Sequence, residues 1–254
     1  MSTKIEWTEE TWNPVTGCTK ISPGCANCYA EAMCQRFWKQ WDREPPPHHF
    51  RLRTHLDRLE QPRNWKKARL VFVCSMSDLF HPAVANWVIE KLFNTMAACP
   101  QHTFQILTKR SDRMLLNRTA LFAGSVLPNV WLGVTTESQD TADLRIPDLL
   151  KTPAVVRFAS VEPMLEPIDL WQYLGGDRNP IGPAYNDRGL DWVIIGCESG
   201  PNRRPMELDW AIYLVRQCRA AGVSVFVKQI PVNGKVSKDP SEWPMELRVR
   251  EYPR

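Results

Sequence analysis

The chain has 254 residues, of which 43% are hydrophobic and 24% are charged, and its formal net charge is +4. This composition is typical of a globular protein with a sizeable core, and no apolar run approaches the length of a membrane span, which excludes a membrane-spanning protein. The small positive charge leaves a nucleic-acid partner open. The first residues show no apolar segment typical of a signal peptide, so we expect the protein in the cytoplasm.

Three cysteines lie close together near the start of the chain. Cys18, Cys25 and Cys28 form a C-x6-C-x2-C pattern on a loop shaped by glycine and proline. In a reducing cytosol such clusters are typical of metal or iron–sulfur binding rather than of disulfides. A structural zinc site and an ordinary iron–sulfur cluster each take four ligands. Three cysteines therefore predict a cluster with one open metal position, where chemistry can occur.

A helix is predicted directly after the last of these cysteines. Tyr29, Met33, Phe37 and Trp41 recur every four residues, which indicates an amphipathic helix over about 28–41. The cysteine loop then lies at the amino terminus of a helix, where the helix dipole favours anionic thiolates.

The segment 42–64 breaks this pattern. Its three consecutive prolines at 45–47 exclude a helix interior or a central strand. We interpret the segment as an inserted loop over one face of the fold. The segment is basic because it contains arginines such as Arg51, Arg53, Arg58 and Arg63.

Short apolar strands then alternate with helical periods. A helix with Val84, Val88, Leu92 and Met96 on one face follows the first strand, Ser111 is placed to cap another helix, and Gly222 is placed to end the helix before the last strand. The strands are predicted at 70–74, 103–107, 129–134, 154–158, 192–195 and 223–227. Repeated β-then-α units predict an α/β fold, a partial or irregular (βα) barrel in a single domain over 1–254, with inserted loops at about 42–64 and 175–190.

Several phrases of the sequence resemble a phage and prophage family of radical-SAM-like proteins, within the radical S-adenosylmethionine superfamily. Besides the cysteine loop, the phrases are Ser75–Phe80, Leu107–Arg110, Trp131–Val134, Val161–Pro163 and Gly196–Pro201. The resemblance implies a barrel of the radical SAM type and a [4Fe-4S] cluster held by Cys18, Cys25 and Cys28. It also implies S-adenosyl-L-methionine on the fourth iron, an electron donor such as flavodoxin or ferredoxin, and the cytoplasm of the host if the protein is phage-encoded.

Polar residues follow the ends of the predicted strands, where sites lie in folds of this class. The segment from Ser75 to Asp78 stands where the superfamily usually has a Gly-Gly-Glu phrase. Any one residue could instead cap a helix or pair with a neighbour, and Cys197 could be a simple buried thiol rather than a hydrogen-atom donor. The predicted cofactor-binding residues are Ser75, Ser77, Asp78, Thr135, Glu137, Ser160 and Glu162. The predicted catalytic residues are Glu198, Cys197 and Lys109.

The function expected from these features is that of a radical SAM enzyme. It would generate a deoxyadenosyl radical to modify or rearrange a substrate. The inserted loops and tryptophans such as Trp38, Trp41 and Trp65 favour a nucleic-acid base or nucleotide, as in phage DNA modification by an isomerase or a transferase, over a peptide. The alternative is a structural zinc or iron–sulfur protein that binds nucleic acid or a partner without catalysis, with Cys34 or His81 as a fourth ligand.

Overall fold

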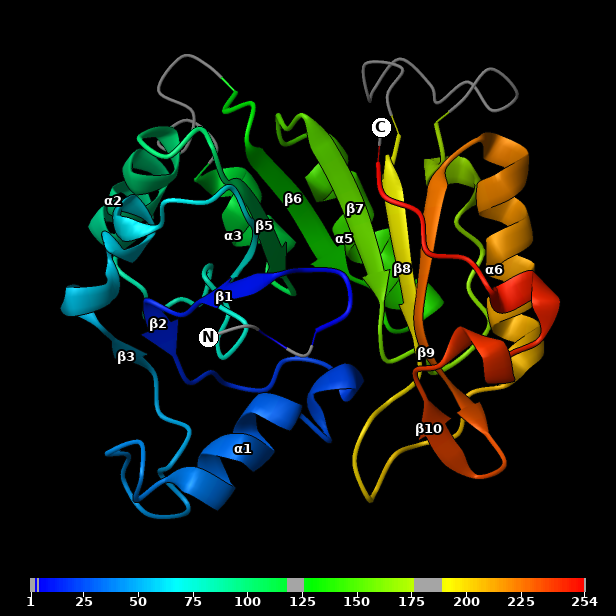
Figure 1. Cartoon of the computed structure of the whole chain (residues 1–254), viewed down its shortest axis with the longest axis horizontal. Coiled ribbons are helices and arrows are strands. Elements are labelled where there is room, and N and C mark those ends of the chain that lie inside the picture. Colours follow the sequence, from blue (N-terminus) through cyan, green and yellow to red (C-terminus); the bar gives the residue numbers. More distant parts are fainter. Residues whose placement is uncertain (1–2, 4, 118–125, 176–188, 254) are drawn as a thin grey trace. The chain divides into compact units, whose positions relative to one another are not determined.

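The computed structural model describes residues 3, 5–117, 126–175 and 189–253. It is a mixed α/β fold with an eight-stranded, mostly parallel sheet in the order β1-β4-β5-β6-β7-β8-β9-β10 (Figure 1). The strands are β1 (Glu10–Trp12), β4 (Leu70–Val73), β5 (Thr103–Thr108), β6 (Val130–Thr135), β7 (Val156–Val161), β8 (Trp192–Gly196), β9 (Ser224–Val232) and β10 (Lys235–Ser237). A separate antiparallel pair joins β2 (Val15–Thr16) to β3 (Arg53–Thr54).

The sheet is open rather than closed. Among the described residues, β1 pairs only with β4 and β10 only with β9, the latter pair being antiparallel. The predicted α/β class and parallel sheet are confirmed, whereas closure into a barrel is not. In the described part of the chain no helix is both long and apolar enough to cross a membrane.

The predicted helices form, although the first ends at Phe37 rather than near residue 41. They are α1 (Tyr29–Phe37), α2 (Asn86–Ala97), α3 (Ser111–Leu116) and α6 (Leu208–Ala221). Gly222 ends α6 with a φ of 72°, as a left-handed cap residue should. Ser111 is the first residue of α3 rather than its cap, so that prediction was wrong.

A further helix, α5 (Gln139–Leu150), was not predicted, because Pro147 interrupts its periodic pattern. Its local start signal is nevertheless present in the sequence. Ser138 and Thr141 exchange hydrogen bonds between side chain and backbone, which makes a capping box at the first turn.

The contacts divide the chain into two compact units. Unit 1 comprises residues 1–132 and 152–155, and unit 2 comprises residues 133–151 and 156–254. In unit 1 the apolar side of α2 supplies Val88, Leu92 and Met96 to the core. The prediction of a single domain stays a prediction.

In unit 2 an aromatic cluster crosses three strands of the sheet. The rings of Phe158 and Trp192 lie 5.7 Å apart, those of Trp192 and Phe226 lie 6.1 Å apart, and Tyr252 packs on both Trp192 and Phe226. The indole of Trp192 also donates to the carbonyl of Glu251 at 2.8 Å. The segment near Tyr252 is thereby held on the aromatic face of the sheet.

The two predicted inserted loops have different outcomes. The segment 42–64 consists of turns, short 3-10 helices and β3. Each of its four predicted basic residues has an acidic neighbour in the same segment, and the pairs are Arg51–Glu44, Arg53–Asp42, Arg58–Asp57 and Arg63–Glu60. Its positive charge is therefore largely offset locally. Of the second loop, residues 176–188 lie outside the described part of the chain.

Candidate functional site

The carboxyl ends of three parallel strands meet in unit 1. The Gly17 amide donates to the Met76 carbonyl at 2.9 Å, and the Ser77 hydroxyl donates to the Gly17 carbonyl at 2.6 Å. Gly17 has a φ of +85°, and a Cβ at this position would lie 2.1 Å from the carbonyl oxygen of Arg51. Only glycine fits such a close backbone approach. These contacts fix the start of the cysteine loop against the residues that follow β4.

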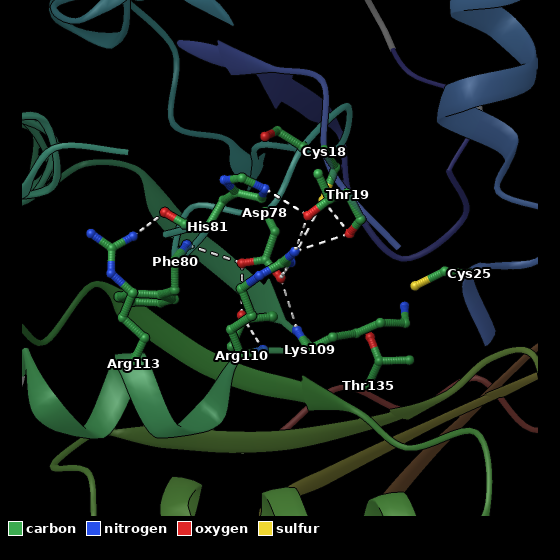
Figure 2. A network of polar contacts seen from close by, with 12 residues as sticks. Cys18, Thr19, Cys25, Asp78, Phe80, His81, Lys109, Arg110, Arg113 and Thr135 are labelled. Atoms are coloured by element: carbon green, nitrogen blue, oxygen red, sulfur yellow. Dashed lines mark hydrogen bonds and ion pairs between the residues drawn. The ribbon is translucent and has the colours of Figure 1, made fainter. Parts of the chain in front are cut away.

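A buried ion pair forms the centre of the site (Figure 2). The guanidinium of Arg110 donates to Asp78 Oδ2 at 3.0 Å, and both side chains are 7% exposed. The other carboxylate oxygen, Oδ1, accepts hydrogen bonds from the Thr108 hydroxyl at 2.7 Å and the Phe80 amide at 3.0 Å. Since the Lys109 amide also donates to Oδ2, both oxygens of Asp78 are occupied within the protein. Asp78 therefore positions its neighbours rather than offering a free acceptor.

Arg110 also reaches the cysteine loop. Its second amino group donates to the carbonyl of Thr19 at 3.0 Å and to the hydroxyl of Thr19 at 3.1 Å. The His81 ring lies 2.9 Å from the same hydroxyl, and its Nδ1 accepts from the Ala83 amide, so Nε2 carries the proton and donates to Thr19. Burial, together with the positive charge of Arg110, lowers the pKa of His81, so the imidazole ring stays neutral.

The first two cysteines of the loop have different environments. Cys18 lies beside Arg110, which donates to its sulfur at 3.5 Å, and burial raises the pKa of its thiol despite that positive charge. Burial also acts to raise the pKa of Cys25, but hydrogen bonds from the backbone of Ile21 and Ser22 and the positive charge of Lys109 outweigh it, so the pKa is lowered. Figure 2 shows the Lys109 side chain extended toward Cys25, whereas Cys18 contacts Arg110.

The remaining predicted residues of unit 1 hold the loops together. The Ser75 hydroxyl donates to Asn13 Oδ1 at 3.2 Å, and the Tyr29 hydroxyl donates to the Ser75 carbonyl. Cys28 is the residue that precedes the first turn of α1. The prediction that the cysteine loop lies at a helix amino terminus is confirmed for this residue.

The other predicted residues belong to unit 2, where three carboxylates each pair with a cation. Glu137 is fully buried and accepts from Arg145 at 2.7 Å. Glu198 accepts from the backbone and side chain of Arg204, and Glu162 pairs with Lys228 at 2.6 Å. Gly196 leaves room for Glu162, since a Cβ there would lie 3.2 Å from its carboxylate carbon.

Three more predicted residues of unit 2 are almost fully buried. Thr135 and Ser160 lie on β6 and β7, and Cys197 follows β8. Burial, together with the negative charge of Glu162, raises the pKa of Cys197 to about 12, so its thiol stays protonated.

The residues that sequence reasoning missed are the partners Thr19, Arg145 and Arg204. Nothing in the sequence marks them, because their roles arise from folded geometry.

A comparison with protein families matches residues 2–243 to DUF5131, described as a protein of unknown function. The chain belongs to the DUF5131 family. No curated protein and no solved structure matches it. The predicted membership of the radical S-adenosylmethionine superfamily was wrong, because the matching DUF5131 model gives no indication of it and the described residues show no side-chain group of the expected kind.

The cysteines as they stand in this DUF5131 protein do not fit an iron–sulfur cluster. No group of three or more His, Cys, Asp or Glu side chains in the described residues is placed to hold a metal ion. The physical reason is that Cys18 contacts Arg110 whereas Cys25 contacts Ser22, 3.7 Å away, so the sulfurs are held by separate partners. The cluster and S-adenosyl-L-methionine stay predictions, and iron with sulfide in anaerobically purified protein would show that the loop rearranges.

The contrast between the two thiols predicts different reactivities. We expect iodoacetamide to alkylate Cys25 faster than Cys18 near neutral pH, because the thiolate reacts and the pKa is lowered for Cys25 and raised for Cys18. The rate at Cys25 should also level off at a lower pH. Mass spectrometry of timed digests measures both rates.

The Lys109→Gln variant is the control for this measurement. It should slow alkylation of Cys25 and leave Cys18 unchanged, because Lys109 contributes to the lowered pKa of Cys25 while Cys18 responds to Arg110. Equal rates at the two thiols in the unmodified protein would contradict the described loop geometry.

Proposed function

We propose that the protein is an enzyme that modifies a nucleotide or a nucleic-acid base, bound at the carboxyl edge of β1, β4 and β5. The observation that carries the proposal is the ammonium of Lys109. It lies near Cys25, and among the described residues no ion pair or hydrogen bond engages it. In open parallel sheets, ligands bind outside the carboxyl ends of the strands, which is where Lys109 follows β5.

The other cations around the loop have partners. Arg110 is paired with Asp78, Lys20 with Glu31, and the guanidinium of Arg113 donates to the carbonyl oxygens of His81 and Val84. Lys109 therefore differs from these three cations of the described loop region in being available for an external anion. A lysine ammonium binds phosphate as a point charge, so a phosphate group suits this position.

A flat ring is available at the same edge. The hydroxyl of Tyr29 is tied to the Ser75 carbonyl, while the residue as a whole is 44% exposed. A nucleobase can stack on such a ring, whereas a peptide carboxylate would pair with Lys109 and leave Tyr29 unused. This combination favours a nucleotide over a peptide as the substrate.

Two features support catalysis rather than binding alone. The thiol of Cys25, with its lowered pKa, is half-exposed and next to a cation, as reactive cysteines usually are. The buried Asp78–Arg110 pair holds the surrounding loops rigidly, as a preorganised site requires.

All eight cysteines are free, which supports the predicted cytoplasmic location.

Titration with nucleoside monophosphates tests the proposal. We expect Lys109→Ala to weaken binding about tenfold or more, because a charge-assisted contact to phosphate is lost. Lys151→Ala, which removes an exposed lysine at the end of α5, should leave binding unchanged. Equal affinity of the Lys109→Ala variant, or no binding of any nucleotide or oligonucleotide by the unmodified protein, would refute the proposal.

A further inference from the structure

We propose that the exposed face of α1 and the turn after it bind single-stranded nucleic acid and direct it to the cysteine loop. The inference rests on the proposed function and narrows its substrate to a strand rather than a free nucleotide. The evidence is the unusual orientation of α1. Its small residues Ala30 and Cys34 are buried, whereas its large side chains face outward.

The outward side is an apolar and aromatic stripe. Tyr29 is 44% exposed, Met33 is 38% exposed and Trp41 is 40% exposed. Phe37 lies between them, half-buried, and its ring stands 5.5 Å from that of Trp41 with an interplanar angle of 32°. Large side chains left outside at this spacing mark an interaction surface, since burial is their usual state.

Two exposed cations flank the stripe. The guanidinium of Arg36 lies 5.1 Å from the centre of the Phe37 ring, and the ammonium of Lys39 lies 5.3 Å from that of Trp38. Both cations are exposed, and the structure gives neither an acidic partner among the described residues. The nearby carboxylates are already paired, as Glu31–Lys20, Asp42–Arg53 and Glu44–Arg51.

The combination of exposed rings and cations favours a single strand of nucleic acid as the ligand. A single strand offers successive bases to stack on aromatic rings and phosphates to pair with cations, which matches the alternation along α1. An acidic peptide would match the charges but not the flat rings, and a duplex would hide its bases. In the described part of the chain, Arg36 and Lys39 have no acidic partner, whereas Arg51, Arg53, Arg58 and Arg63 of the segment 42–64 each have one.

The helix leads directly to the proposed catalytic residues. Cys28 precedes its first turn, and Tyr29 is anchored to the residues that follow β4. A strand lying along α1 would therefore reach the cysteine loop at the amino-terminal end of the helix.

Fluorescence anisotropy with a labelled oligothymidylate tests the inference. We expect Trp41→Ala to weaken binding about tenfold, because one stacked base is lost. The double variant Arg36→Gln, Lys39→Gln should reduce the slope of log affinity against log salt by roughly 1.4, for two phosphates of a single strand. Trp87→Ala on α2 is the matched control, since this tryptophan is 55% exposed and does not belong to the proposed binding surface on α1.

The outcomes separate the two proposals. If mononucleotides bind through Lys109 but the oligonucleotide binds no tighter, or Trp41→Ala binds it as well as the unmodified protein, the inference about α1 falls and the proposed function stands. An equal loss in Trp87→Ala would also overturn it. If the protein binds anionic phospholipid vesicles through Trp41 and does not bind the oligonucleotide, the ligand of α1 is a membrane surface and the inference of a nucleic-acid strand is wrong.

Discussion

Replacing Asp78 by alanine should lower the free energy of unfolding by about 3 to 5 kcal/mol, because it leaves the charge of Arg110 buried without a partner. The same change removes the acceptor of the Thr108 hydroxyl and of the amides of Phe80 and Lys109. Urea unfolding followed by circular dichroism measures the difference.

An exposed ion pair of the same unit provides the comparison. Glu44→Ala breaks the Arg51–Glu44 pair, whose side chains are more than half exposed, and should cost about 0 to 1 kcal/mol. Adding Arg110→Met to Asp78→Ala should recover part of the loss, because the buried charge is then removed as well. Equal costs for Asp78→Ala and Glu44→Ala would show that the buried pair does not form.

Replacing Glu137 by alanine should lower the melting temperature by about 10 °C, since an unpaired Arg145 is left in the core of unit 2. Glu137 is fully buried, and Arg145 is 4% exposed and donates to the Thr135 carbonyl at 2.7 Å as well. Together these contacts join α5 to the end of β6. Differential scanning calorimetry measures the shift.

One further variant separates the effect of charge from that of shape in the Glu137–Arg145 pair, and a second variant is an exposed control. Glu137→Gln keeps an acceptor of nearly the same size, so it should lower the melting temperature less than Glu137→Ala. The exposed carboxylate Glu60, which pairs with Lys91, should tolerate alanine with a shift of only about 2 °C. A larger loss in Glu60→Ala than in Glu137→Ala would contradict the burial described for Glu137.

The order of elements could largely be predicted from the sequence. Apolar runs and helical periods located β4, β5, β6, β8 and α6 within a few residues, because strand and helix periods depend on neighbouring positions. The boundaries of β7 were shifted, β9 continues to Val232 beyond the predicted end at residue 227, and α5 was missed at Pro147. The period predicted a helix over about 28–41, whereas α1 ends at Phe37 and Trp41 lies in the following turn. A period also does not state which side of a helix faces the core.

The candidate site was predictable in its location and not in its contacts. The polar residues predicted to follow the strands include Asp78 and Lys109, which the structure places together after β4 and β5. The pairing of Asp78 with Arg110, and of Arg110 with Thr19, joins positions far apart in the chain and depends on how three loops fold together. The cysteine spacing suggested a shared ligand set, whereas the folded loop directs Cys18 and Cys25 to different partners.

The aromatic cluster of unit 2 also bears on how the chain folds as it leaves the ribosome. Trp192 and Phe226 emerge before Tyr252, whose ring packs on both of them, and before Glu251, whose carbonyl accepts from Trp192. Because domains fold as units during synthesis, unit 2 cannot complete its core until these late residues have left the exit tunnel. Until then, the nascent chain exposes the rings of Trp192 and Phe226. A chaperone that binds apolar surface would act on unit 2 at this stage of synthesis.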